Sequence, residues 1–263
     1  MAVVAAPATE GRAARTRGAV RRWLAWHPAW WVHAVAAWAW AALLVTAWAP
    51  SSGGGAMAAH EHGLAAPGTG FLAGWTEAWG HWTLMIAAMM LPVVAPQVRV
   101  VARRSLWTRQ QRSAAAYVAG YFAVWVAAGA LLLAPLVLLD AYPLGTPWLV
   151  AVLLVAAVWQ VSRPRRRVLR RCAGLKLGAA TGRAADRDCA REGVRAGGRC
   201  LVTCGPVMLS MLAGHSLVLM AGLLLVLLSE RSRGPDPLRR VGRPREAWVL
   251  VGFAVVAGAV TLT

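Results

Sequence analysis

The stretch GHWTLMIAAMMLPVVAP, residues 80–96, decides how this chain folds. It contains no acidic residue and no Lys or Arg, and it lies between a tryptophan-rich segment and an arginine-rich one. With its flanks it is long enough to cross the hydrocarbon core of a bilayer as a helix. Pro92 and Pro96 should kink or end that helix. We therefore predict a membrane-spanning helix over residues 75–97.

The composition of the whole chain is typical of a polytopic membrane protein. Of 263 residues, 59% are hydrophobic, and the 15 tryptophans suit a membrane–water interface. The net charge is +18, with the basic residues in blocks between the apolar runs. Such blocks favour loops facing an anionic leaflet over a nucleic-acid surface. We expect an all-α transmembrane helix bundle in the plasma (inner) membrane, with the lipid bilayer and not nucleic acid as its surroundings.

About six spans are expected after a basic tail over residues 1–28. We treat residues 29–263 as a single transmembrane domain, with a basic cytoplasmic segment over 163–199 that fits, in part, an interfacial amphipathic helix. The expected spans are 29–49, 75–97, 114–139, 148–162, a fifth within 200–229, and 247–263.

The distribution of basic residues predicts the orientation of these spans. The blocks 1–28, 99–112 and 163–199 carry 5, 5 and 12 basic residues, whereas 50–74 and 140–147 carry none. By the positive-inside rule the three basic blocks, including the N-terminus, should be cytoplasmic.

The fifth span raises a difficulty. If 200–229 crossed once, the six arginines of 230–245 would lie outside. Thirty residues make a helix of about 45 Å, too long for one crossing and too short for two. Either the segment breaks at 214–216 into a re-entrant pair of half-helices, or the rule fails here.

Two predicted helices carry soft metal donors on one face. In the fifth segment, helical stepping places five donors within an arc of about 80°: Cys200, Cys204, Met208, Met211 and His215. In the second span, His81, Met85 and Met89 follow Glu77 along a similar stripe. Thiolates and thioethers prefer Cu(I), and imidazole is an intermediate donor. The pattern predicts a metal site between the two helices.

Other interpretations of these residues stay open. Packing alone explains Met85 and Met89 equally well. His215 is harder to explain by packing, since ionisable residues inside a span usually face a cavity or the bundle interior. A weaker metal candidate is the Gly-rich loop with His60 and His62, which a solvated loop also explains.

No arrangement of residues in the sequence predicts catalysis. There is no phosphate-binding loop, no placeable Ser-His-Asp set and no pair of intramembrane carboxylates. We expect that the protein is not an enzyme.

The second span also carries a recognisable motif, W-x-x-M-x-x-A-M-M-x-P-x-x-x-P. It is formed by Trp82, Met85, Ala88, Met89, Met90, Pro92 and Pro96. The run resembles the hallmark of a bacterial family described as predicted metal-binding integral membrane proteins, a domain of unknown function in which some members are labelled copper chaperones. Copper is the metal that this resemblance implies.

The resemblance extends over about residues 75–260. Further matching positions are Gly120, Tyr121, Trp125, Trp159, Gln160, Pro164, Cys200, Cys204, Met208 and Glu230. The family's late cluster has adjacent cysteines, and here Thr203 replaces the first of that pair. His215 stands where methionine is typical, which keeps a donor at that position.

The sequence thus predicts a membrane metal-handling protein that binds or delivers copper between its second and fifth spans, with a membrane protein or metalloenzyme as partner. An alternative is a non-catalytic scaffold or assembly subunit whose small-residue helices pack on a partner. A small-ion transporter is less favoured, because no inverted repeat is found.

Overall fold

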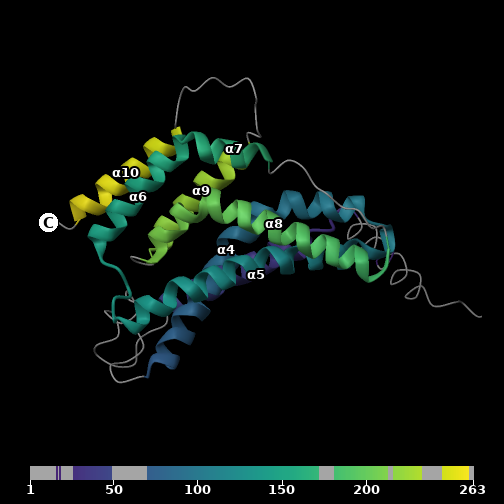
Figure 1. The fold of residues 1–263 in the computed structure, drawn as a ribbon, viewed down its shortest axis with the longest axis horizontal. Helices are drawn as coiled ribbons and strands as arrows, with labels where there is room; N and C mark the ends of the chain where they lie inside the picture. Colours follow the sequence, from purple (N-terminus) through teal and green to yellow (C-terminus); the bar gives the residue numbers. More distant parts are fainter. Residues whose placement is uncertain are drawn as a thin grey trace, which may run out of the picture.

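The structure is a computed structural model that describes residues 16, 18, 26–48, 70–171, 181–212, 216–232 and 245–260. These residues form helices and connections, with no strand among them, so the all-α class is confirmed for this part of the chain (Figure 1). The α-helices are α2 (Trp30–Trp48), α4 (Phe71–Arg104), α5 (Gln110–Leu138), α6 (Thr146–Val161), α7 (Arg163–Arg171), α8 (Gly182–Leu209), α9 (Leu217–Ser232) and α10 (Arg245–Val260). Two short 3-10 helices, η1 (Trp107–Arg109) and η2 (Ser210–Leu212), adjoin α5 and α8.

Three of these helical segments are long and apolar enough to cross a membrane: Trp30–Trp48, Phe71–Arg104 and Trp107–Leu138. A fourth crossing results if Thr146–Val161 and Arg163–Leu169, which are bent by 65°, form one span. Within the described residues, length and composition therefore support three or four of the six predicted crossings. The last predicted span corresponds to α10, which has 16 residues.

Helix α4 continues through both of its prolines instead of ending at them. A proline has no N–H for the carbonyl of the residue four positions earlier, so Pro92 deprives Ala88 of its helical partner. The indole of Trp40, on α2, donates to the Ala88 carbonyl at 3.1 Å. A neighbouring helix thus replaces the lost bond, which is one way in which apolar helices tolerate proline.

We expect Trp40→Phe to lower the free energy of unfolding by about 1–3 kcal/mol, the cost of leaving a buried carbonyl unpaired. In a Pro92→Ala background the cost should be smaller, because residue 92 then supplies its own N–H to Ala88. Thermal unfolding of the four proteins of this double-mutant cycle in detergent measures the coupling. Equal costs in both backgrounds would mean that the indole contributes by packing alone.

Tryptophans also join α4 to α5. Three of them lie at helical spacing on α4, and each donates its indole N–H to a carbonyl of α5: Trp75 to Ala130 at 3.3 Å, Trp79 to Val126 at 3.1 Å and Trp82 to Trp125 at 3.2 Å. Since the acceptors descend along α5 as the tryptophans ascend along α4, the two helices are antiparallel. Gly129 makes room for Trp82, because a Cβ there would overlap the indole ring.

Glycines let α5 and α8 approach each other closely. A Cβ on Gly193 would overlap the carbonyl of Tyr117, and one on Gly197 would press on the carbonyl of Tyr121. Gly193 meets Tyr117 and Gly197 meets Tyr121, so residue numbers rise together along the two helices, and α8 runs parallel to α5. Helix α5 lies between α4 and α8, while α6 packs mainly on α10.

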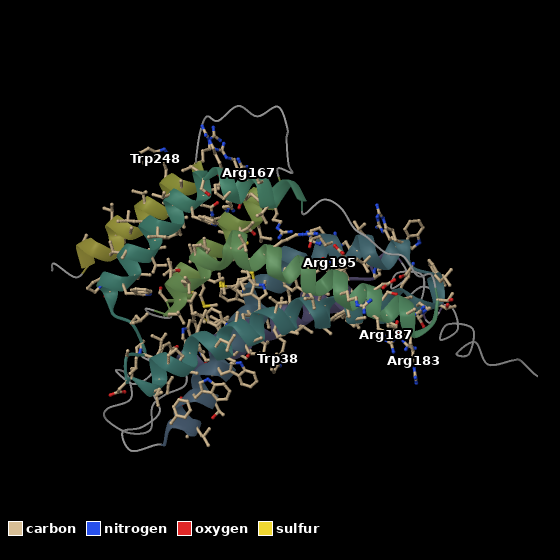
Figure 2. All side chains as sticks on the ribbon, in the orientation of Figure 1. Trp38, Arg167, Arg183, Arg187, Arg195 and Trp248 are labelled. Carbon is tan, nitrogen blue, oxygen red and sulfur yellow. The ribbon has the colours of Figure 1, made fainter. Side chains whose placement is uncertain are left out.

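Helix α8 begins well before residue 200, where the fifth span was expected to start. Its first half has a buried face at helical spacing, formed by Ala185, Cys189, Glu192 and Gly193. Arginines project from the remaining surface, as Figure 2 shows for those it labels on α8. Hydropathy alone does not reveal this half of the helix, because its apolar face is narrow and its arginines are many.

The predicted fifth span is broken, and the chain turns back within it. Helix α8 ends at Leu209, η2 ends at Leu212 and α9 begins at Leu217. Near the end of α9, Nη2 of Arg231 lies 3.9 Å from Sγ of Cys200. The segment therefore begins and ends at the same level, which is the geometry of two half-helices and not of one crossing.

Candidate metal centre

Two cysteine thiols that form no disulfide lie side by side in the interior of the protein. Cys200 and Cys204 are four residues apart on α8, so their side chains share one helix face. Their Sγ atoms are 3.6 Å apart, and the residues are only 1% and 4% exposed. We call these two residues the thiol pair.

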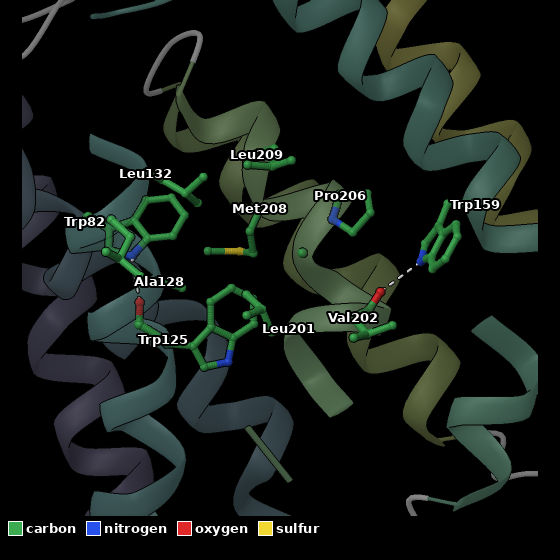
Figure 3. A pocket seen from close by; sticks show the side chains of 12 residues that line it. Trp82, Trp125, Ala128, Leu132, Trp159, Leu201, Val202, Pro206, Met208 and Leu209 are labelled. Carbon is green, nitrogen blue, oxygen red and sulfur yellow. Dashed lines mark hydrogen bonds between the residues drawn. The ribbon is translucent and has the colours of Figure 1, made fainter. Parts of the chain in front are cut away.

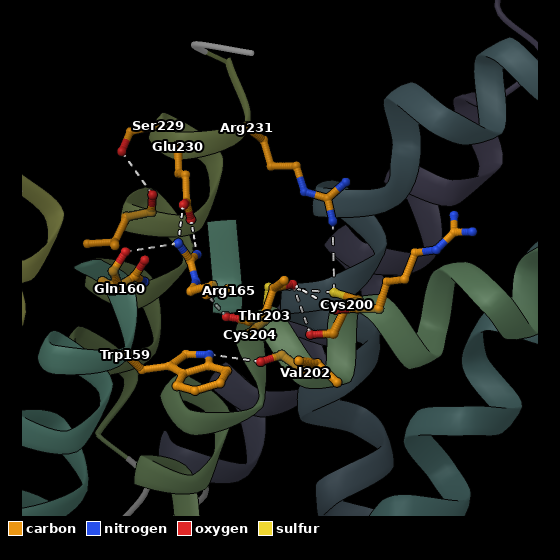
Figure 4. A network of polar contacts seen from close by, with 12 residues as sticks. Trp159, Gln160, Arg165, Cys200, Val202, Thr203, Cys204, Ser229, Glu230 and Arg231 are labelled. Carbon is orange, nitrogen blue, oxygen red and sulfur yellow. Dashed lines mark hydrogen bonds and ion pairs between the residues drawn. The ribbon is translucent and has the colours of Figure 1, made fainter. Parts of the chain in front are cut away.

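Polar groups from two other helices reach the thiol pair. The hydroxyl of Tyr121, on α5, donates to Sγ of Cys200 at 3.1 Å. The guanidinium of Arg231, on α9, approaches the same sulfur (Figure 4). The hydroxyl of Thr203 lies 3.6 Å from Sγ of Cys204. One hydroxyl donor, that of Tyr121, and one positive charge thus lie beside a sulfur atom that would carry negative charge as a thiolate.

A buried arginine fixes the end of α9 that carries Arg231. Arg165 is 1% exposed, and its Nη1 and Nη2 donate to the two carboxylate oxygens of Glu230 at 2.6 and 2.5 Å. Its Nε donates to the Thr203 carbonyl at 3.0 Å. One guanidinium therefore ties α7, α8 and α9 together beside the thiol pair (Figure 4).

Two methionines continue the donor face beyond the thiol pair. Met208 and Met211 are both fully buried. Met208 lies near the indoles of Trp82 and Trp125, in the wall of an apolar pocket of about 490 Å³ (Figure 3). The thioether face is therefore packed among aromatic rings and aliphatic side chains.

In the same pocket wall, an indole again replaces a helical hydrogen bond that a proline removes. Pro206 removes the N–H that would reach the carbonyl of Val202, and Trp159 donates its indole N–H to that oxygen at 2.9 Å (Figure 3). This contact anchors α6 to α8 within the helical turn that carries the thiol pair.

The predicted donors on α4 are buried, with one exception. Met85 and Met89 belong to the same hydrophobic core as the thiol pair, and His81 is half-buried, whereas Glu77 is exposed. Helix α4 packs mainly on α2 and α5, and α8 packs mainly on α5 and α6. A metal role for the α4 face stays a prediction.

Three predicted donors, His215, His60 and His62, lie outside the described residues. Within the described part of the chain, no three His, Cys, Asp or Glu side chains cluster as a metal site. Among the described residues the thiol pair is thus a two-sulfur site, and the buried thioethers of Met208 and Met211 continue the same helix face.

Residues 79–262 match the family PpoB2, described as a copper chaperone family. This match covers more than half of the chain. The chain belongs to this copper chaperone family. No curated protein and no solved structure matches it.

The copper chaperone family match includes every residue of the thiol-pair environment, from Tyr121 to Arg231. Sequence reasoning found the sulfur donors by helical stepping, and the family resemblance extends to Glu230 and Arg231, but no site role was predicted for Arg165 or Arg231. Both stand in basic runs that resemble solvated surface. Glu230 next to Arg231, at the end of an apolar run, is the one signal that could have pointed to them.

Proposed function

We propose that this copper chaperone family member binds Cu(I) as cargo at the thiol pair of Cys200 and Cys204 and passes it to a partner protein. The observation that carries the proposal is the pairing of two buried thiols, not joined by a disulfide, 3.6 Å apart on one helix face. Thiolates and thioethers are the ligands that select Cu(I) among biological cations. No step of catalysis is needed for this role.

The surroundings of the thiol pair favour a soft monovalent ion. Nearby groups are the Tyr121 hydroxyl, the Arg231 guanidinium and the Met208 face, and the carboxylate of Glu230 is engaged by Arg165. Hard cations such as Mg²⁺ and Ca²⁺ require oxygen ligands. We infer that Met208 or His215 supplies a further ligand when copper is bound.

We also propose that the protein is integral to the inner membrane, with its N-terminus and thiol pair toward the cytoplasm. Three or four helices have the length and composition for crossing. The return of α9 to the level of Cys200 brings Arg231, at the start of the basic run 230–245, back toward the proposed cytoplasmic side, which supports an orientation that obeys the positive-inside rule.

The scaffold alternative loses part of its support. It relied on small residues available for packing against a partner, yet Gly120, Gly193 and Gly197 are used in the α5–α8 contact within this chain. The copper hypothesis, in contrast, is supported by the family and by the thiol geometry.

The proposal is tested by metal titration of the full chain purified in detergent. Under reducing, oxygen-free conditions we expect one Cu(I) per chain to resist competition by a chromogenic Cu(I) chelator, with no comparable retention of Zn²⁺ or Mg²⁺. Extraction of cell membranes with alkaline carbonate should leave the protein in the pellet. Absence of retained copper would end the copper proposal, and release by carbonate would end the membrane proposal.

A further inference from the structure

Arginine occupies every fourth position along the first half of α8. The residues are Arg183, Arg187, Arg191, Arg195 and Arg199. On an α-helix, steps of four residues advance by about 40°, so these side chains form one slowly winding row along the surface. We call this row the arginine stripe. It ends beside Cys200, the first residue of the thiol pair.

The outer part of the arginine stripe carries a surplus of positive charge, because Asp188, which stands between Arg187 and Arg191 in the sequence, can offset only one of its three arginines. Arg183, Arg187 and Arg191 are exposed, and no carboxylate of the described residues forms an ion pair with them. The inner two arginines contact the buried carboxylate of Glu192 instead. Like charges four residues apart on a helix repel each other, so the row costs helix stability unless an external anion is present.

Asp186 does not offset this charge, because Arg109 and Arg112 already engage it. Those two ion pairs attach the start of α8 to the start of α5. Tyr117 on α5 donates in turn to Gln97 on α4 at 3.0 Å. The first half of α8 is thus part of a three-helix end with a surplus of arginine.

The helices α4 and α5 that form this three-helix end are longer than the hydrocarbon core of a bilayer. Helices α4 and α5 have 34 and 29 residues, or about 51 and 43 Å at 1.5 Å per residue. The hydrocarbon core is about 30 Å thick. In the proposed orientation α8 begins at the cytoplasmic ends of these helices, where Asp186 pairs with Arg109 and Arg112. Arg183 and Arg187 therefore lie beyond the predicted span 114–139 and face water, and Arg191 lies closer to the membrane, because its neighbours Ala190 and Gly193 meet Gly120 and Tyr117 of α5.

We propose that the arginine stripe is the docking surface for an acidic protein that exchanges copper with the thiol pair. The guanidinium fork suits carboxylates, which it binds through two parallel hydrogen bonds. A row of such groups leading to Cys200 would steer an acidic partner toward the site and hold its copper-bearing residues near the thiols. This inference rests on the proposed function for the cargo, but docking itself can be measured without copper.

The test uses the full chain in nanodiscs of zwitterionic lipid and two synthetic helical peptides. One carries glutamate and the other lysine at every fourth position, and both contain a Cys-x-x-Cys copper site. Binding of the copper-free, fluorescently labelled peptides is followed by anisotropy. At low salt we expect the acidic peptide to bind at least about tenfold more tightly than its lysine counterpart, and 1 M salt to abolish the difference.

Charge reversal provides the matched control. Arg187→Glu/Arg191→Glu should lower the affinity for the acidic peptide by about tenfold or more. Arg163→Glu/Arg167→Glu alters the net charge equally on exposed positions of α7, and it should change the affinity far less. Transfer of Cu(I) from the loaded acidic peptide should slow in the stripe variant only, with the affinity of the thiol pair for Cu(I) unchanged.

Several outcomes would overturn the inference. Equal binding of the two peptides would do so, as would equal losses in both charge-reversed variants. The inference would also be overturned if the stripe variant differed from the wild type only in weaker binding of phosphatidylglycerol-containing vesicles, since the stripe would then be a lipid contact. A wild-type protein that retains no Cu(I) but still prefers the acidic peptide would contradict the proposed function and leave the docking surface standing.

Discussion

The Cys200→Ser/Cys204→Ser variant is expected to bind Cu(I) more than about a hundredfold more weakly than the wild-type chain. Even groups that only orient a ligand are worth about tenfold to a hundredfold in metal affinity, so loss of the ligands themselves should cost more. Serine keeps the size of the side chain and replaces a soft donor by a hard one. The loss should therefore be specific to soft metals.

Each single variant should lose most of this affinity, because one thiol cannot replace two. Met208→Leu should have a smaller effect, since it removes at most one thioether and keeps the packing volume. Cys189→Ser is the matched control, because Cys189 is a buried thiol of the same helix, forms no disulfide and stands apart from the thiol pair. It should leave the Cu(I) affinity unchanged.

Equilibrium competition with a chromogenic Cu(I) chelator measures all of these affinities. X-ray absorption of the bound copper provides a second readout, because sulfur ligation should disappear in the double variant. Retention of copper with unchanged sulfur ligation would mean that the site lies elsewhere, for example on the Met85 and Met89 face of α4. An effect of Cys189→Ser as large as that of Cys204→Ser would point to a general packing defect.

The sulfur-bearing face of α8 could be predicted because it depends on one property of the helix, its period. Cys200, Cys204, Met208 and Met211 lie within one arc by stepping, and all four are buried. The positions of α2, α4, α5 and α6 followed from apolar run length in the same way. Local regularity is what hydropathy and spacing can detect.

The contacts that bring polar groups to the thiol pair could not be predicted, because these groups come from distant parts of the chain. Arg165 stands in a run of arginines, and nothing in its local sequence separates it from its exposed neighbour Arg167. Its burial depends on the break at Ser162, which turns α7 across the end of α9. Likewise, the donor that replaces the missing N–H of Pro92 at the Ala88 carbonyl is Trp40, a residue of another helix.

The second large effect, a loss of stability, is expected from breaking the buried ion pair of Arg165 and Glu230. Glu230→Gln should lower the free energy of unfolding by about 3–5 kcal/mol, because it leaves a guanidinium buried without its counter-charge. The Arg165 side chain is 2% exposed and that of Glu230 is 24% exposed, so the lower part of this range is the better expectation. Thermal unfolding in detergent measures the loss.

Stability and copper binding can be separated at this ion pair. The Arg165→Met/Glu230→Leu variant removes both charges, and apolar replacement of a buried ion pair is often neutral for stability. We therefore expect it to unfold near the wild-type temperature. It should still bind Cu(I) more weakly, by about tenfold, because the end of α9 is no longer held where Arg231 faces Cys200.

The Arg231→Met variant is compared with the Arg165→Met/Glu230→Leu variant. It leaves the ion pair intact and removes only the positive charge near the sulfur of Cys200. If Arg165 and Glu230 act by positioning Arg231, Arg231→Met should weaken Cu(I) binding as much as the double variant does, and adding it to the double variant should change nothing further. Additive losses would instead mean that the two groups act on the thiol pair independently. Full Cu(I) affinity in a stable Arg165→Met/Glu230→Leu protein would show that the ion pair serves the fold alone.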